Sequence, residues 1–236
     1  MLEFDSLMVR AANLRVRSLI LTHDATLKSN EQLLIDLAAE AQELDDALVS
    51  WSQELPEDWK VSTQPSPVAM DSSENGLFYS GPVHIFTTHG HGAIWLRYRA
   101  IRLIVSSMCN RALSKLVESP FPGDLIVARQ ALCQKNIESI ANDICSSVPF
   151  FFNLPNDPAG TPGLKSIRLG KFIFSTDDDI LPKMAIFLAW PLTVAVSTDG
   201  VPDPQRQWLR HRLKLAASSL GDAVLESVAE RAEFRF

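Results

Sequence analysis

Hydrophobic residues recur every three or four positions along most of the chain, which is the spacing of one face of an α-helix. The clearest stretch begins after Ser29, because a serine three residues before Gln32 is typical of a helix start, and it ends before Pro56. Its apolar face consists of Leu33, Leu37, Ala41, Leu44, Leu48 and Trp51. The opposite face carries Glu40, Glu43, Asp45 and Asp46, and we expect these four carboxylates to face solvent.

The same spacing predicts helices over about residues 6–21, 91–118 and 124–148, the last with Asp124 as its N-cap. A stretch over about residues 181–196 is apolar nearly all round, which predicts a helix at the centre of a bundle with a kink at Pro191. Asp203 and Pro204 are typical of the N-cap and first residue of a helix, which Gly221 should end. A short helix over about residues 223–233 completes the pattern.

Two long stretches lack this periodicity. Residues 61–82 and 153–179 are rich in residues that favour turns, and they predict long irregular loops. Residues 83–86 are typical of an isolated extended piece, and the strand signal elsewhere is too weak for a sheet. The pattern therefore predicts an all-α fold, an irregular bundle of about six to seven helices. We expect a single domain over residues 1–236 with the two loops as insertions.

Composition and charge narrow the class of protein. Of the 236 residues, 46% are hydrophobic and 21% charged, which is typical of a globular chain. The formal net charge is −6, and no segment reads as the basic arm that a duplex-binding surface needs, so we expect no direct contact with DNA. The most apolar stretch, residues 184–196, is shorter than the about 20 residues that span a bilayer. The N-terminal residues lack the apolar core of a signal peptide, so a soluble intracellular protein is expected.

Candidate chemistry is sparse. Cys109, Cys133 and Cys145 are widely spaced and odd in number, which predicts buried, reduced thiols rather than disulfides or a zinc site. Histidines gather only at residues 84, 89 and 91. We interpret His84, His89 and His91 as part of a glycine-containing loop before the next helix, with a weak metal or pocket role as the alternative. No metal, cofactor or catalytic residue is predicted.

Two other patterns resemble functional motifs only in part. Residues 160–166 have a composition similar to that of a phosphate loop, but the spacing of the glycines and the lysine is wrong for one. Asp177, Asp178 and Asp179, with the earlier run from Asn142 to Ser146, suggest the magnesium motifs of an all-α lyase or cyclase. The order of these motifs is reversed, and position 150 is phenylalanine where a glutamate is needed. Asp179 is better explained as the cap of the following helix.

Arg97, Arg99 and Arg102, interleaved with Trp95 and Tyr98, raise the question of nucleic-acid contact. Arg97 and Arg99 point to different sides of a helix, so a single basic surface does not follow from them. We instead expect these arginines to pair with carboxylates or to lie over aromatic rings.

Four segments resemble a known family. They are WSQELPEDW (Trp51 to Trp59), VHIFTTHGHGAIWLRYRAIR (Val83 to Arg102), ICSSVPFFFNL (Ile144 to Leu154) and LAWPLTVAVSTDGVPDPQRQWLRHR (Leu188 to Arg212). Their order and separation resemble the regulatory domain of fungal transcription factors of the zinc binuclear cluster type. The chain departs from the family at Leu96, where an asparagine often follows the tryptophan, and it contains no six-cysteine DNA-reading module.

The resemblance implies a nuclear regulatory domain that acts through protein partners, another transcription regulator or coregulator, or through a small-molecule effector. Regulators of this family commonly control metabolic or secondary-metabolite genes. Whether the chain is a whole gene product or the C-terminal part of a longer regulator stays open, and so does a cytoplasmic location.

An effector pocket is the candidate site. The aromatic residues Phe150, Phe151, Phe152, Trp190 and Trp95 are its expected lining, with ordinary core packing as the competing interpretation. The alternative function is a small-molecule-binding helical protein with no transcriptional role, and an all-α lyase or cyclase is the less favoured third hypothesis.

Overall fold

The computed structural model describes residues 2–23, 31–67, 76–118, 123–153, 166–175 and 180–231. These residues form seven α-helices, two short 3-10 helices and four short strands, so the predicted all-α bundle is confirmed. The chain divides into two compact units. Unit 1 comprises Met1–Leu55, Ile101–Ile140 and Thr198–Gly200, and unit 2 comprises Pro56–Ala100, Ala141–Ser197 and Val201–Phe236. The single domain expected over residues 1–236 stays a prediction.

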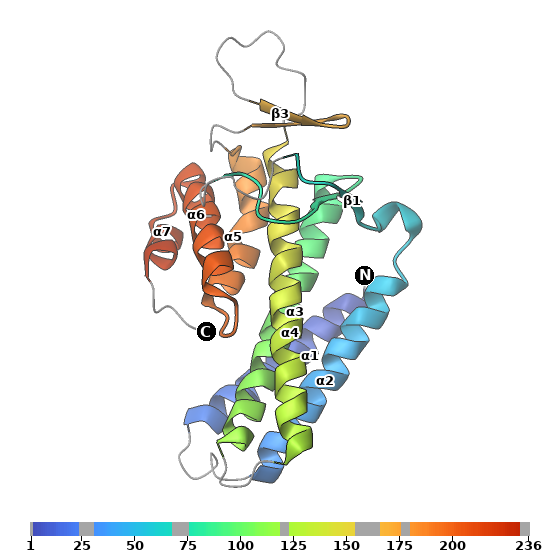
Figure 1. The fold of residues 1–236 in the computed structure, drawn as a ribbon, viewed down its shortest axis with the longest axis vertical. Helices are drawn as coiled ribbons and strands as arrows, with labels where there is room; N and C mark the ends of the chain where they lie inside the picture. Colours follow the sequence, from blue (N-terminus) through green and yellow to red (C-terminus); the bar gives the residue numbers. More distant parts are fainter. Residues whose placement is uncertain are drawn as a thin grey trace. The chain divides into compact units, whose positions relative to one another are not determined.

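Unit 1 is built from four helices (Figure 1). They are α1 (Leu2–His23), α2 (Glu31–Gln53), the second part of α3 (His89–Val117) and the first part of α4 (Asp124–Ser147). The core contains the fully buried side chains of Leu14, Leu44, Leu48, Leu103, Met108, Leu113 and Ile137. Leucines thus turn inward from α1, α2 and α3, and Leu44 and Leu48 lie on the apolar face that was predicted for α2.

Two contacts show that α1 and α2 run antiparallel. The ring of Phe4, at the start of α1, stacks on Trp51, near the end of α2, with 4.3 Å between ring centroids. Further along α1, Arg17 forms an ion pair with Glu40, which lies earlier in α2. Contacts that advance along one helix and retreat along the other define an antiparallel pair.

Unit 2 contains the start of α3, the end of α4 and the helices α5 (Pro182–Ser197), α6 (Asp203–Leu220) and α7 (Ala223–Glu230). The last three pack against one another, as the orange and red ribbons of Figure 1 show. Two 3-10 helices, η1 (Glu57–Trp59) and η2 (Val148–Phe152), complete the helical part. Pro149 ends α4 as predicted, and the chain continues directly as η2.

The predicted loops contain strands that the sequence pattern did not reveal. In the first, β1 (Ser62–Gln64) pairs antiparallel with β2 (Val83–Ile85), so the extended piece at residues 83–86 is not isolated. In the second, β3 (Ser166–Leu169) and β4 (Phe172–Ser175) form an antiparallel hairpin around Gly170, whose φ is +57°. The expectation that no sheet forms was wrong, because strands of three or four residues are too short to show an alternating pattern.

The prediction for α5 was wrong in part. Met184, Leu188 and Leu192 are buried, but Ile186 and Trp190 are exposed on the first half of the helix. An all-round apolar sequence therefore does not place this half of α5 at the centre of a bundle. The helix continues through Pro191.

Several helix ends differ from the prediction by a few residues. The helix α1 begins at Leu2, α3 begins at His89, and α7 ends at Glu230. Asp203 is the first residue of α6 rather than its N-cap, since Pro202 holds that position, and α4 likewise begins at Asp124 itself. Gly221 ends α6 in the left-handed conformation, φ +66°, as predicted.

Some predictions fall outside the described residues, namely the helix start at Ser29, the aspartates at 177–179 and most of the glycine-containing run at 160–166. Among the helices that the structure describes, none has the length and apolar character needed to cross a membrane.

We predict that Gly200→Ala destabilises the chain by about 2 kcal/mol in urea unfolding, from backbone strain and a lost hydrogen bond. Gly200 has φ +86°, its carbonyl accepts a 2.7 Å hydrogen bond from Gln134 of α4, and a Cβ would lie 2.6 Å from the Gln134 Oε1 atom. Gly221→Ala is the matched control, because its Cβ meets nothing and only the strain term of about 1 kcal/mol remains. Equal effects of the two changes would contradict the role of the Gln134 contact.

Candidate functional site

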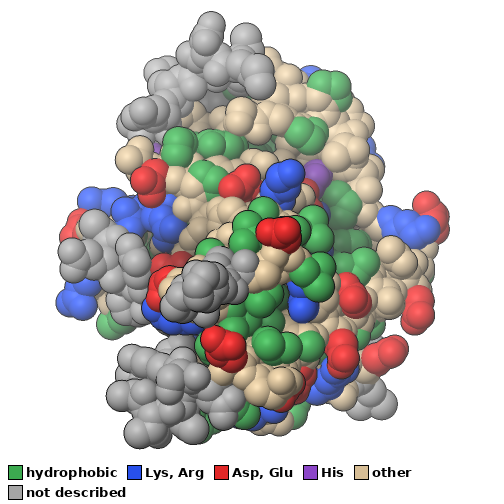
Figure 2. Space-filling view, turned by 60° about the horizontal axis from the view of Figure 1, so that its bottom comes forward, with side chains coloured by type: hydrophobic (Ala, Val, Ile, Leu, Met, Phe, Trp, Pro, Cys, Tyr) green, Lys and Arg blue, Asp and Glu red, His purple; other side chains and the backbone are tan. Residues whose placement is uncertain are grey.

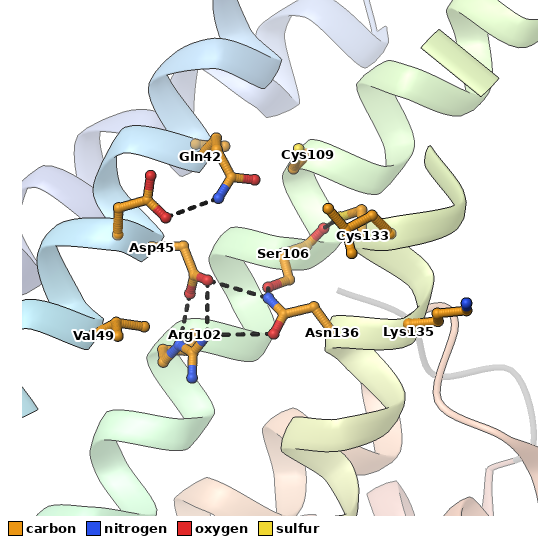
Figure 3. Close-up of a pocket in the computed structure, with 12 residues that line it drawn as sticks. Gln42, Asp45, Val49, Arg102, Ser106, Cys109, Cys133, Lys135 and Asn136 are labelled. Carbon is orange, nitrogen blue, oxygen red and sulfur yellow. Dashed lines mark hydrogen bonds and ion pairs between the residues drawn. The ribbon is translucent and has the colours of Figure 1, made fainter. Parts of the chain in front are cut away.

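An open cleft of about 360 Å³ lies in unit 1 among α2, α3 and α4 (Figure 3). Its polar side chains are Gln42, Asp45 and Asp46 from α2, Arg102 and Ser106 from α3, and Lys135 and Asn136 from α4. Cys109 and Cys133 also line it, and Ala41, Val49 and Leu132 supply apolar surface. The cleft therefore combines buried polar groups with an exposed rim.

A buried ion pair forms the floor of this cleft. Arg102 donates from Nε to Asp45 Oδ1 at 2.7 Å and from Nη2 to Asp45 Oδ2 at 2.8 Å. Asn136 donates from Nδ2 to Asp45 Oδ2 and to Ser106 Oγ, each at 3.1 Å, and its Oδ1 accepts from Arg102 at 3.3 Å. Three donated hydrogen bonds thus satisfy the carboxylate, as a buried charge requires.

The sequence prediction placed Asp45 on the solvent-facing side of its helix, and this was wrong. Asp45 is only 6% exposed, whereas Glu43 and Asp46 are exposed. The residue lies four positions after Ala41 and three before Leu48, so it shares their side of the helix. The sequence did contain a signal: a carboxylate on the apolar side of a helix must be buried, and it therefore needs a buried partner.

The chemistry of the cleft favours binding over reaction. The oxygens of Asp45 are engaged by Arg102 and Asn136, so this carboxylate is not free to take a proton from a ligand. At the rim, Gln42 donates a 2.9 Å hydrogen bond to Asp46, and the exposed Lys135 supplies the opposite charge. A small polar molecule that carries both donors and acceptors fits this arrangement best.

We predict that Asp45→Ala lowers the free energy of unfolding by about 3 kcal/mol, because it leaves the Arg102 guanidinium without its buried partner. Asp46→Ala is the matched control on the same helix. Its carboxylate is exposed, so a change within about 0.5 kcal/mol is expected. Urea unfolding followed by circular dichroism measures both, and similar values for the two variants would contradict the prediction.

A second polar cluster lies in unit 2 around Ser147. Its Oγ donates to the Asp143 carbonyl at 2.8 Å, accepts from Arg99 Nη1, and lies 3.1 Å from His84 Nδ1. Burial first, and the nearby Arg99 charge second, lower the pKa of His84 to about 3. The serine hydroxyl thus donates to a backbone carbonyl rather than to His84.

The arginine prediction is confirmed for two residues. Arg102 pairs with Asp45, while Arg99 approaches Asp143 at 3.8 Å and lies over the Trp95 ring at 5.4 Å. Arg97 is exposed.

We predict that His84 makes the chain acid-sensitive. Its folded pKa of about 3 lies below the ordinary value of 6.5, so between these pH values the unfolded chain binds the proton that the folded chain excludes. Stability from this group is therefore present at neutral pH and is lost as pH falls below 6.5. Between about pH 7 and pH 5 the wild type should lose about 2 kcal/mol more than His84→Gln. Urea unfolding at the two pH values tests this, and parallel pH profiles would rule it out.

The predicted pocket residues differ in burial. Phe150 and Phe151 contact each other edge to face at 5.8 Å between centroids, and Phe152 is buried beneath the Arg212 guanidinium. Trp190, in contrast, is 43% exposed on α5. The three phenylalanines are core residues, and they do not line either of the two larger described cavities.

Trp95 is held in place on α3 and is only part-buried. Its Nε1 donates to the Trp59 carbonyl at 2.7 Å, and its ring meets Tyr98 edge to face. A cavity of about 430 Å³ in unit 2 does lie beside the phenylalanine cluster, because Phe86 and Phe172 line it and both rings contact Phe150. The sequence had indicated the aromatic cluster but not which of its rings border open space.

The three histidines are spread over different contacts. His89 and His91 belong to the first turn of α3 rather than to a loop, and His91 stacks on Trp59 at 4.3 Å between centroids. His89 lies against the ring of Phe150, and its pKa is lowered by burial and by Lys183. Within the described part of the chain no three His, Cys, Asp or Glu side chains are grouped as a metal would require.

All three cysteines are free and buried, as predicted. Asn142, which belongs to the partial lyase-like pattern, accepts a hydrogen bond from Gln205 of α6.

Comparison with known proteins adds no identification. No family model, no curated protein and no solved structure matches the chain.

Proposed function

We propose that the chain is a regulatory module of a transcription regulator, and that it acts in the nucleus through a protein partner rather than through its own contact with DNA. The observation that carries the proposal is the inward direction of the two arginines in the Tyr98-Arg99-x-x-Arg102 pattern. Both guanidinium groups form internal contacts, with Ser147 and with Asp45. These cations are therefore engaged inside the protein and are not available to phosphates.

The segments that carry the family resemblance also hold the core of unit 2, which supports the proposal. The run from Ile144 to Leu154 contains η2 with its buried phenylalanines. The run from Leu188 to Arg212 contains most of α5 and the start of α6, where Arg212 is fully buried. Residues that pack a helical core, rather than residues of a catalytic site, carry the likeness. A control of metabolic or secondary-metabolite genes is part of this proposal.

An exposed apolar stripe on α1 is the surface that we assign to the partner. Val9, Val16 and Ile20 are 61%, 57% and 53% exposed. Their separations of seven and four residues place them on one side of the helix, in the spacing of a seam between two helices. An amphipathic helix fits this spacing, and because of the family resemblance we assign that helix to a zinc-cluster regulator. On the face shown in Figure 2, hydrophobic side chains lie among charged ones of both signs, without a continuous basic field.

The cleft in unit 1 favours a second candidate function. Its volume of about 360 Å³ and its mixed polar lining suit a small metabolite. The chain would then be a metabolite-binding protein without a transcriptional role, or the metabolite would be the effector of the regulatory module.

We predict that the full chain, fused to a heterologous DNA-binding domain in a fungal reporter strain, changes reporter expression and captures a six-cysteine zinc-cluster regulator. Val16→Lys should weaken that capture about tenfold, because the apolar seam loses its central contact. Ser139→Lys is the matched control, since it adds the same charge at an exposed polar position of another helix, α4.

Three results would separate the candidates. If Val16→Lys controls the reporter as well as the control variant does, the assigned surface is wrong. A silent reporter without capture of a zinc-cluster regulator would overturn the regulatory proposal. A metabolite retained in native mass spectrometry, together with a silent reporter, would establish the second candidate instead.

A further inference from the structure

Two of the three cysteines lie together at the contact between α3 and α4. The side chains of Cys109 and Cys133 both line the cleft of unit 1 (Figure 3), and they lie close enough for each thiol to shift the pKa of the other. Cys133 Sγ also lies 3.2 Å from the Ser106 carbonyl, and Cys109 Sγ lies 3.6 Å from the Ala38 carbonyl. Cys145 belongs to unit 2 and shares neither contact.

The register of the two helices keeps the cysteines opposite each other. One turn before Cys109, Ser106 Oγ accepts a 3.1 Å hydrogen bond from Asn136, one turn after Cys133. On the other side, Gln130 donates to Asn110 at 3.5 Å. These contacts bracket the cysteine pair and define antiparallel helices at this point. The two thiols therefore meet because of helix packing and not because of a mobile loop.

The two thiols are buried beside the cleft and are chemically unequal. Cys133 is 8% and Cys109 3% exposed, and the cleft they line is open to small molecules. The interaction with Cys133 lowers the pKa of Cys109 against the effect of burial, and Arg129 lowers it further, whereas the interaction with Cys109 and burial both raise the pKa of Cys133. The thiolate is the reactive form of cysteine, so Cys109 is the better nucleophile of the two.

We propose that Cys109 and Cys133 form an oxidation site, at which a small hydroperoxide converts the two thiols into an intramolecular disulfide. Cys109 loses its proton, and its sulfur attacks the terminal oxygen of the peroxide. The O–O bond breaks, an S–O bond forms, and the proton leaves with the displaced oxygen as water or an alcohol. The sulfur of Cys133 then attacks the sulfur of Cys109. The S–O bond breaks, the S–S bond forms, and the hydroxide leaves with the Cys133 proton as water.

The two reaction steps balance in electrons and protons. Two thiols lose two electrons, the peroxide gains them, and both thiol protons leave in the products. The disulfide would join α3 to α4 one turn away from Ser106 and Asn136, the residues that flank the buried Asp45. Oxidation at this place thus acts on the floor of the cleft. The inference goes beyond the proposed function and does not rest on it.

The sequence makes the test direct, since each cysteine lies on its own tryptic peptide. Cys109 is in the peptide of residues 103–111, Cys133 in that of residues 130–135, and Cys145 in that of residues 136–165. The full folded chain is treated with hydrogen peroxide, alkylated, digested and analysed by mass spectrometry. We expect a dithiothreitol-sensitive link between the first two peptides, at least about tenfold more abundant than any link to the third, because the paired thiols have a high effective concentration.

Variants separate the roles of the sulfurs. In Cys133→Ser, dimedone should trap a sulfenic acid on the peptide of Cys109. In Cys109→Ser, no link between the two peptides should form, because one of the two sulfurs is missing. Cys145→Ser is the matched control, and it should leave the link unchanged. The same wild-type chain in urea should give all three pairings.

Three outcomes would overturn the proposal. One is a folded chain whose thiols survive the peroxide unchanged. Another is separate oxidation of Cys109 and Cys133 to sulfinic acids without a link. The third is a folded chain that links Cys145 as often as the unfolded chain does.

Discussion

The buried pair of Arg102 and Asp45 is the interaction on which the packing of unit 1 depends. One charge comes from α2 and the other from α3, and Asn136 brings α4 into the same network. A buried charge is stable only while its partner stays in place, so the network fixes which turn of each helix faces the others. Apolar packing alone would tolerate a shift of one helix along another far better.

Arg99 has the corresponding role in unit 2. It lies one turn before Arg102 on α3, and it contacts Ser147 at the end of α4. The single helix α3 thus supplies one internally bonded arginine to each unit, Arg102 to unit 1 and Arg99 to unit 2. The pattern Tyr98-Arg99-x-x-Arg102, which contributed to the family resemblance, therefore has a physical explanation in this chain. Both arginines position helices, and neither has to contact a ligand for the pattern to be needed.

The helices could be predicted from the sequence because they are long. A stripe such as Leu37, Ala41, Leu44 and Leu48 extends over several turns, and its period is then unambiguous. The strands could not be predicted, since β1 and β2 have three residues each and their pairing depends on segments far apart in the chain. Helix ends shifted by a few residues for a related reason, because a cap is set by local hydrogen bonds that the hydrophobic period does not record.

The candidate site was mostly beyond sequence reasoning. The phenylalanines at 150–152 were correctly recognised as a cluster, but a run of adjacent aromatic residues fits a core as well as a pocket. The polar cleft needed Asp45, Arg102 and Asn136 to be placed together from three helices. Only Arg102 had been expected to find a carboxylate, and its partner had been assigned to the solvent side. A charge on an apolar stripe predicts that some partner exists but does not say which one.

The position of the cysteine pair follows from the alignment of α3 against α4. Ser106 and Cys109 are one turn apart on α3, and Cys133 and Asn136 are one turn apart on α4. In an antiparallel pair of helices, a contact between Ser106 and Asn136 brings Cys109 opposite Cys133 in the next layer. The polar network and the thiol pair are thus neighbouring layers of one helix contact. Because the network holds the register and the thiols sit one turn away, a bond between the sulfurs and a ligand in the cleft would act on the same packed surface.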